Sequence, residues 1–292
     1  MVKVLGVDIG GTKVRMSVVD EAGNISLDEK LPTQFPLYPY LEEQVLRFLE
    51  LDPEIEAIGI GTHGFVDPAQ GKVIYATETL RGWTGTKVKE QLERATGKLV
   101  EVENDANAAA LAEAKFGAAK GYGRTVCLTL GTGLGGGIIW DGKLLSGGKH
   151  GGAAEVGHMI LYPNGVLCTC GREGCYEQYV SGTALVRRIK EAGLPITPQE
   201  LFVAAKTDPE AQKVVDGFTK DLALVISSLQ AAFDMDIVVI GGGVSESAEL
   251  WWDQFNRQLD LVLLNPLEVK VAKFENEAGI LGAALLVLEK LK

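Results

Sequence analysis

The sequence predicts an α/β protein built from two related domains. Val2 to Ile9 and Val14 to Asp20 are apolar segments of strand length, joined by the glycine-rich turn Gly10-Gly11-Thr12-Lys13. The same order of strand, glycine-rich turn and strand recurs between Val126 and Leu145. Because a repeated unit of this kind indicates an internal duplication, we expect two domains of one plan that face each other.

Strands and helices alternate along the rest of the chain. We expect further strands at residues 25–31, 55–61, 99–103, 124–130, 138–141, 236–240 and 267–274. We expect helices at residues 40–51, 86–96, 105–117, 180–191, 197–206 and 209–233, another that Ser245 caps, and a last amphipathic helix at 276–291. Asn104 or Asp105 is the natural N-cap of the alanine-rich helix that follows. Thr197-Pro-Gln-Glu200 is a capping box, and Asp141-Gly142 indicates a hairpin.

Composition limits the class of protein. The chain has 292 residues, 46% of them hydrophobic and 23% charged, which is enough for two packed domains. A formal charge of −11 argues against nucleic acid or an anionic membrane as a partner, because both require basic surfaces. No apolar run approaches the roughly 18 residues of a membrane span, and Asp8 interrupts the segment where a signal peptide would be apolar. We therefore expect a cytoplasmic protein.

Three of the four cysteines and one of the three histidines lie in a short segment, residues 158–175, which we call the cysteine loop. His158, Cys168, Cys170 and Cys175 form a Cys₃His set, which is typical of a structural Zn²⁺ site with no open ligand position. A disulfide or ordinary buried thiols are the alternatives. A bridge between Cys168 and Cys170 would be strained, and the loop is polar and rich in glycine, so the pattern favours zinc.

Two carboxylates flank the cysteine loop. Glu155 precedes it and Glu177 follows it. A loop held by a metal would keep both carboxylates and His158 in fixed positions, as recognition of a polar ligand requires. The metal is therefore predicted to shape a site and to leave the chemistry to other groups.

Three glycine clusters follow apolar strands: a first turn at residues 10–13, a second turn at 131–137 and a third turn at 241–243. Such clusters let backbone N–H groups approach phosphate oxygens closely. Any one of them alone is better explained as a tight hairpin. The second turn satisfies G-x-G-x-x-G, but a dinucleotide fingerprint opens a helix, and here a strand follows. The sequence contains no P-loop motif.

The duplicated unit and Asp8-Ile-Gly-Gly-Thr-Lys13 together resemble the ATPase superfamily that includes sugar kinases and actin. Glu155-Val-Gly-His158, the spacing Cys168-x-Cys170-Gly-x-x-Gly-Cys175-x-Glu177, Asn104-Asp105 and the second and third turns are similar to the ROK family of bacterial sugar kinases and repressors. The resemblance covers essentially the whole chain. It implies a two-domain actin-like ATPase (ribonuclease H-like) fold with a cleft between the domains. The expected small domain is residues 1–112 plus 276–292, closed by the C-terminal helix, and the large domain is residues 113–275 with the zinc site.

The resemblance also implies roles for single residues. Asp105 would be the catalytic base, although a plain N-cap is the alternative for that position. The residues implied to hold the sugar are Gly64, Asn104, Asp105, Glu155, His158 and Glu177. Those implied to contact ATP, with Asp8 reaching Mg²⁺ through water, are Asp8, Gly10, Gly11, Thr12, Lys13, Gly131, Thr132, Gly133, Gly135, Gly241, Gly242 and Gly243. Phosphoryl transfer needs positioning, charge neutralisation and one proton acceptor, which agrees with this set.

We therefore expect an ATP-dependent hexokinase of the glucokinase type that phosphorylates the 6-hydroxyl of glucose or a close aldohexose, and a homodimer, as is usual in the family. Mannose, an N-acetylhexosamine, fructose or a β-glucoside remain open as substrates, and polyphosphate as donor. A sugar-sensing repressor would carry a basic helix-turn-helix ahead of the first strand, whereas this chain starts at that strand. A non-catalytic sugar-binding module is disfavoured by the intact turns and Asp105.

Two stretches depart from the family pattern. His63 stands where glucokinase-like members usually carry proline, and Thr79-Leu-Arg81-Gly-Trp83 replaces a segment of the type Asn-Leu-Pro-Gly-Trp. Both stretches are expected beside the sugar. The changes leave the reaction class untouched and bear on which hexose is used.

Overall fold

The computed structural model describes residues 2–274 and 277–291, and the chain divides into two compact units. The first unit is Met1–Lys120, Gly137–Ala154 and Asn276–Lys292, and the second is Gly121–Gly136 and Glu155–Glu275. The first unit thus holds the predicted N-terminal segment with the C-terminal helix, and in addition residues 113–120 and 137–154. The predicted start of the last helix, Asn276, lies outside the described residues.

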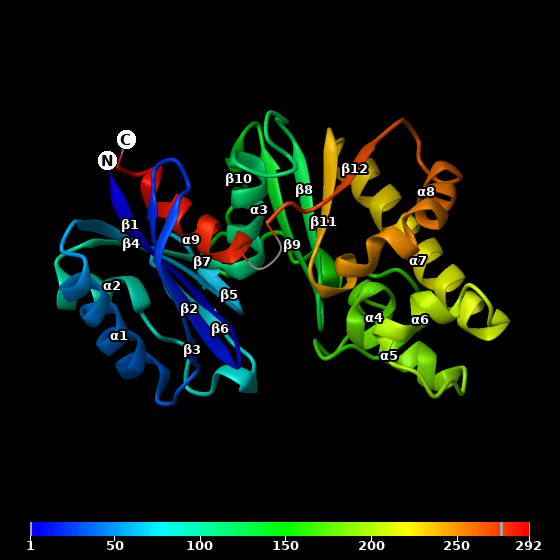
Figure 1. The fold of residues 1–292 in the computed structure, drawn as a ribbon, viewed down its shortest axis with the longest axis horizontal. Helices are drawn as coiled ribbons and strands as arrows, with labels where there is room; N and C mark the ends of the chain where they lie inside the picture. Colours follow the sequence, from blue (N-terminus) through cyan, green and yellow to red (C-terminus); the bar gives the residue numbers. More distant parts are fainter. Residues whose placement is uncertain (1, 275–276, 292) are drawn as a thin grey trace. The chain divides into compact units, whose positions relative to one another are not determined.

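A five-stranded sheet in the order β3-β2-β1-β4-β7 forms the centre of the first unit (Figure 1). The strands are β1 (Lys3–Ile9), β2 (Lys13–Asp20), β3 (Ile25–Pro32), β4 (Ile55–Thr62) and β7 (Leu99–Asn104). The first three form the predicted antiparallel meander, while β1, β4 and β7 run parallel. Ile9 pairs with Thr62, and Thr62 pairs with Asn104. The carboxyl ends of three parallel strands therefore lie together at one edge of the sheet.

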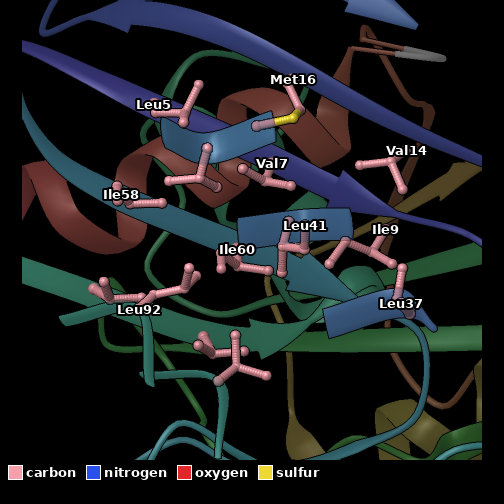
Figure 2. Packing of buried hydrophobic residues seen from close by; sticks show 14 of the residues in the cluster. Leu5, Val7, Ile9, Val14, Met16, Leu37, Leu41, Ile58, Ile60 and Leu92 are labelled. Atoms are coloured by element: carbon pink, nitrogen blue, oxygen red, sulfur yellow. The ribbon is translucent and has the colours of Figure 1, made fainter. Parts of the chain in front are cut away.

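One face of this sheet carries the apolar core of the first unit. Leu5, Val7 and Ile9 alternate along β1 and belong to one buried cluster with side chains of α1 (Leu37–Leu51) and α2 (Val88–Thr96), among them Leu41 and Leu92 (Figure 2). The period of two along β1 places Gly6 and Asp8 on the opposite face. A carboxylate thus reaches the sheet edge without entering the core.

The other face is covered by α9 (Ala278–Leu288), which packs on α3 (Asp105–Lys115). A Cβ at Gly59 of β4 would overlap the backbone of Ala283, and a Cβ at Gly282 would overlap the backbone of Ala108. Glycine at these places lets α9 approach both neighbours closely. The prediction that this helix is amphipathic is wrong, because α9 lies between the sheet and α3 and is buried almost all round.

The second sheet has the order β10-β9-β8-β11-β12 and repeats the plan of the first (Figure 1). Its strands are β8 (Thr125–Leu130), β9 (Leu134–Trp140), β10 (Lys143–Leu144), β11 (Ile237–Gly241) and β12 (Glu268–Val271). In both sheets the first three strands in sequence form one side and later parallel strands extend the other. The predicted duplication is confirmed.

The boundary predicted for the strand at 138–141 is wrong, because β9 already begins at Leu134. Gly135, Gly136 and Gly137 belong to the strand rather than to the turn. A Cβ at Gly137 would overlap Ala110 of α3, so this glycine serves close packing of a helix on the strand.

The second unit is otherwise helical. Its helices are α4 (Glu177–Val180), α5 (Gly182–Glu191), α6 (Pro198–Ala204), α7 (Pro209–Phe233) and α8 (Trp252–Asp260). The Thr197 capping box of α6 is confirmed. The predicted helix at 180–191 is divided, because Ser181 is extended and caps α5. Ser245 caps no helix: its hydroxyl donates to the Gly242 carbonyl within a 3₁₀ segment, Gly243–Leu250.

Three further observations complete the fold. The sequence reasoning missed a small hairpin of β5 (Phe65–Asp67) and β6 (Lys72–Tyr75), which follows the bend at Gly64 in the first unit. The predicted hairpin signal at Asp141-Gly142 is confirmed, since both residues adopt positive φ between β9 and β10. Among the described residues, no helix combines the length and apolarity needed to cross a membrane.

Candidate functional site

Asn104 and Asp105 lie where β7 meets α3, at the sheet edge of the first unit. The Asn104 side-chain oxygen accepts hydrogen bonds from the N–H groups of Ala106 (2.9 Å) and Asn107 (3.1 Å), so Asn104 is the N-cap. Its amide nitrogen donates to the Gly64 carbonyl at 3.1 Å. The structure therefore brings Gly64, Asn104 and Asp105 together. Asp105 Oδ1 also accepts from the Ala106 N–H at 2.9 Å, but Asn104 is the residue that caps α3.

Asp105 and Asp8 are two half-buried carboxylates of the same unit. Burial raises the pKa of Asp105, and the charge of the nearby His63 opposes that rise. Burial, and then repulsion by Asp105, raise the pKa of Asp8 to about 6 against the opposite effect of Arg15. Two carboxylates that repel each other at a strand edge are suited to holding a cation or to accepting a proton.

The first turn is held in shape by backbone contacts and by Thr33. The Gly10 N–H donates to the Lys13 carbonyl at 3.0 Å. The Thr33 hydroxyl donates to the Gly10 carbonyl at 2.9 Å, and the Thr33 N–H donates to the Thr12 carbonyl at 3.0 Å. Gly11, Thr12 and Lys13 remain exposed. The carbonyls are thus turned to internal partners, which is the arrangement expected of a turn that presents N–H groups to an anion.

The predicted metal ligands come together in the second unit. Donor atoms of His158, Cys168, Cys170 and Cys175 all lie within 4.8 Å of one another. Cys168 Sγ is 3.7 Å from His158 Nδ1, and Cys170 Sγ is 3.6 Å from Cys175 Sγ. A tetrahedron with Zn–S bonds of about 2.3 Å has edges of about 3.8 Å, so these spacings fit one four-coordinate metal. Burial raises the pKa of the Cys170 thiol, but hydrogen bonds, first from Arg172, bring it to about 7.

Glu177 lies between the cysteine loop and the second turn. Its Oε2 accepts a hydrogen bond from the Leu134 N–H at 3.1 Å, and its Oε1 is 3.8 Å from Cys168 Sγ. A Cβ at Gly133 would overlap the same carboxylate. Glu155 immediately precedes the 3₁₀ turn Val156–His158, which carries the histidine ligand. Glu155 and Glu177 therefore lie next to the ligand cluster, one on each side of it along the chain.

The third turn follows β11 directly. Gly242 has φ +87°, and a Cβ there would meet the backbone of Leu130 at 2.6–2.7 Å. Gly243 has open space around its Cα. Glycine at 242 is thus required by the backbone, whereas Gly243 leaves room for a ligand.

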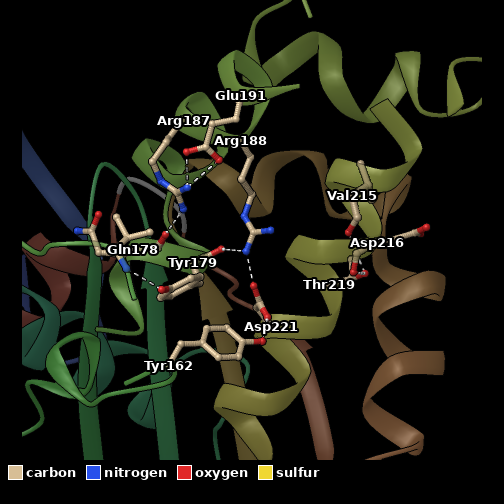
Figure 3. Close-up of polar contacts among 11 residues, drawn as sticks. Tyr162, Gln178, Tyr179, Arg187, Arg188, Glu191, Val215, Asp216, Thr219 and Asp221 are labelled. Atoms are coloured by element: carbon tan, nitrogen blue, oxygen red, sulfur yellow. Dashed lines mark hydrogen bonds and ion pairs between the residues drawn. The ribbon is translucent and has the colours of Figure 1, made fainter. Parts of the chain in front are cut away.

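An ion pair and two tyrosines brace the cysteine loop against helices of the second unit (Figure 3). Tyr162 donates to Asp221 of α7 at 2.6 Å, and Arg188 of α5 pairs with the same carboxylate. Tyr179 packs edge-on against Tyr162, with ring centroids 4.9 Å apart, and its hydroxyl accepts from the Val166 N–H at 2.9 Å. The loop is therefore fixed by side chains as well as by its cysteines.

Sequence reasoning did not identify Thr33 or this brace as part of the site, nor the partner of His63. Thr33 lies at the end of a meander, where a threonine is unremarkable. His63 was expected beside the sugar, but its proximity to Asp105 follows only from the pairing of β4 with β7. Arg188 and Asp221 are on separate helices, and nothing in their spacing brings them together. The only available signal was that each is a polar residue near a predicted strand end or on an otherwise apolar helix face.

The model of the ROK family matches residues 4–290. The glucokinase of Streptomyces coelicolor is 38% identical, with 98% of this chain and 97% of that protein aligned. The N-acetylmannosamine kinase of Vibrio cholerae is 33% identical over 97% of this chain and 98% of its own length.

Among solved structures, a ROK glucokinase of Streptomyces griseus in complex with glucose and AMPPNP superposes with a TM-score of 0.80. It is 36% identical and covers 97% of this chain and 98% of its own. The fold is accordingly the actin-like ATPase fold of these kinases, as the repeated sheet order indicated. With a family match over nearly the whole length and relatives above 30% identity, this chain belongs to the ROK family.

Proposed function

We propose that this ATP-dependent sugar kinase phosphorylates glucose at its 6-hydroxyl. Support comes from glucokinases at 38% and 36% identity, one of them solved with glucose and AMPPNP. The observation that carries the proposal is the position of Asp105, a half-buried carboxylate at the carboxyl end of β7 whose pKa is raised. Asn104 beside it supplies the cap of α3, although Asp105 Oδ1 also accepts from the Ala106 N–H at 2.9 Å.

In the proposed reaction Asp105 is the general base. Its carboxylate takes the proton of the sugar hydroxyl while that oxygen attacks the γ-phosphorus of ATP. The new bond joins the sugar oxygen to phosphorus, the bond from the γ-phosphorus to the bridging oxygen breaks, and ADP leaves. A raised pKa makes Asp105 a better proton acceptor, provided that it remains ionised at the working pH.

The predicted binding residues are kept as part of the same proposal. Sugar hydroxyls would be held by Gly64, Asn104, Glu155, His158 and Glu177, and phosphates or adenosine by the N–H groups of the three turns. Asp8 would bind Mg²⁺ through water, and the mutual repulsion of Asp8 and Asp105 supports a cation there. Mg²⁺, when bound, neutralises charge on the phosphates.

The cysteine loop is proposed to hold a structural Zn²⁺. Three thiolates and one imidazole with tetrahedral spacings are the ligands that this ion prefers. The four ligands fill the coordination sphere, so the metal would hold shape and take no part in the transfer. A homodimer and a cytoplasmic location remain predictions.

The identity of the sugar is tested by coupled kinase assays on glucose, mannose, fructose and N-acetylmannosamine, each with ATP and with polyphosphate. We expect kcat/KM for glucose with ATP to exceed every other pair by at least about tenfold, the discrimination that one well-placed contact provides. N-acetylmannosamine is the second candidate, because a kinase for that sugar is 33% identical. A higher kcat/KM for any sugar other than glucose would contradict the proposal.

Metal analysis should find about one Zn²⁺ per chain, because there is one Cys₃His cluster. Cys170→Ser should lose the metal and weaken glucose binding, measured by calorimetry, since the loop carries His158 and is flanked by Glu155 and Glu177, which are three of the proposed sugar contacts. Cys127→Ser is the matched control: this cysteine is buried in β8, outside the cluster, and the variant should keep its metal. Full activity in zinc-free Cys170→Ser protein would rule out a structural role for the metal.

Asp105→Asn should lower kcat by ~10²–10⁴, the usual contribution of a general base. The affinity for glucose should change little, because the amide keeps the size and Asn104 keeps the cap. Asp208→Asn, at the half-buried N-cap of α7, should leave kcat unchanged. If Asp105→Asn retained more than about a tenth of kcat, a loss below that range, the base would have to be another group, with Glu155 the next candidate.

Asp8→Asn should stabilise the magnesium-free protein at pH 7.5 while abolishing activity. The folded-state pKa of Asp8, about 6, is above its ordinary value of 3.8, so the folded state favours the protonated form. The resulting penalty is absent below pH 4, grows between pH 4 and 6 and is complete above 6. Its upper limit is roughly 3 kcal/mol, at 1.36 kcal/mol for each pKa unit.

Thermal unfolding at pH 4 and pH 7.5 measures this effect, and Asp28→Asn is its control. The Arg15 hydrogen bond lowers the pKa of Asp28, so its carboxylate stabilises the fold at pH 7.5, and the change should have the opposite sign. An unfolding temperature for Asp8→Asn below that of the wild type at pH 7.5 would show that the ionised Asp8 carboxylate does not destabilise the fold.

A further inference from the structure

Residues that flank the cysteine loop on both sides contact the second turn. On the amino-terminal side, Gly157 precedes the ligand His158, and a Cβ at Gly157 would overlap the carbonyl of Leu134. On the carboxyl-terminal side, Glu177 follows Cys175 by two residues and accepts the hydrogen bond of the Leu134 N–H at 3.1 Å. Residues within two positions of a metal ligand thus contact the peptide groups on both sides of Leu134, Gly157 by close approach and Glu177 by a hydrogen bond.

The start of α5 holds the rest of the same turn. The Gly182 N–H donates to the Gly131 carbonyl at 2.7 Å, and the Thr183 hydroxyl donates to the Thr132 carbonyl at 2.7 Å. The Thr183 N–H adds a longer bond to the same carbonyl, at 3.3 Å. A Cβ at Gly182 would lie 2.8 Å from the Gly131 oxygen, so this approach requires glycine.

The start of α5, which makes these bonds, is linked to the cysteine loop through further hydrogen bonds. Arg187 of α5 donates to the Gln178 carbonyl of α4 at 2.8 Å, and Arg188 reaches the Tyr179 carbonyl at 3.3 Å (Figure 3). Arg188 also pairs with Asp221, which binds Tyr162 in the loop. Loop, α4 and α5 therefore form one hydrogen-bonded body with the turn bound to it.

We propose that the cysteine loop with its metal positions the second turn for nucleotide phosphates, with Glu177 and Thr183 as the positioning residues. The inference rests on the proposed phosphate-binding role of that turn. Residues of α5 donate hydrogen bonds to the carbonyls of Gly131 and Thr132. These bonds fix the orientation of the peptide groups in the turn, and therefore the direction in which the N–H groups of the turn point. Loss of the metal then weakens nucleotide binding as well as sugar binding, through one structural element.

Thr183→Val is the direct test, because valine keeps the shape and the N–H but removes the hydroxyl donor. We expect the Kd for AMPPNP, measured by calorimetry without sugar, to rise about 3- to 10-fold, the effect of losing one hydrogen bond. Thr183→Ser should restore wild-type affinity. The Kd for glucose and the zinc content should stay unchanged in both. Equal AMPPNP affinity in the valine and serine variants would overturn the proposal.

Two controls separate this idea from stability and from the proposed function. Thr197→Val removes a hydroxyl cap from α6 of the same unit, so it should lower the unfolding temperature without changing the AMPPNP affinity. Gly131→Val places a side chain in open space at the turn itself. If Gly131→Val leaves AMPPNP affinity intact, the turn is not the phosphate site and the proposed function fails there. If Gly131→Val weakens the affinity for AMPPNP while Thr183→Val and zinc removal do not, the turn binds phosphate but the cysteine loop and α5 do not position it.

Discussion

The convergence of His158, Cys168, Cys170 and Cys175 within 4.8 Å is the constraint on which the second unit's part of the site depends. Structural zinc contributes roughly 10–16 kcal/mol in small peptides, whereas a single hydrogen bond contributes roughly 1 kcal/mol. The free energy of the few hydrogen bonds that hold the second turn is therefore small compared with the free energy of zinc binding in the cysteine loop. Glu177, two residues after the ligand Cys175, makes one of these bonds, and the start of α5 makes the others.

The first unit supplies the two aspartate carboxylates, which lie at one edge of its sheet. Its parallel strands end together, so Asp8 and Asn104-Asp105 come to one place although they are far apart in sequence. Burial raises the pKa of both aspartates, and repulsion by Asp105 raises the pKa of Asp8 further. The glycines that let α9 lie close to the sheet continue to Gly279, where a Cβ would lie 2.6 Å from the Asp8 carboxylate. The close packing that builds the unit therefore also leaves space for the charge.

Much of this arrangement could be predicted from sequence because it depends on local patterns. The repeat of strand, turn and strand predicted two sheets of one order, and the cysteine spacing predicted the ligand cluster. The Asn104-Asp105 pair predicted a cap at the right junction. The sequence could not distinguish glycines that form a turn from glycines that allow close packing. Gly135 to Gly137 look like part of a turn, but they form a strand against which α3 packs closely. Thr183, Thr33 and His63 act through partners that only the tertiary structure brings near.

Amide hydrogen exchange of zinc-loaded and zinc-stripped protein tests the dependence of the turn on the metal most directly. The account predicts faster exchange in peptides that cover residues 131–136 once zinc is removed, since the Leu134 N–H loses the fixed position of Glu177. Exchange in α7 should stay the same, which would show that the second unit remains folded. Faster exchange in the cysteine loop with an unchanged turn would contradict the account.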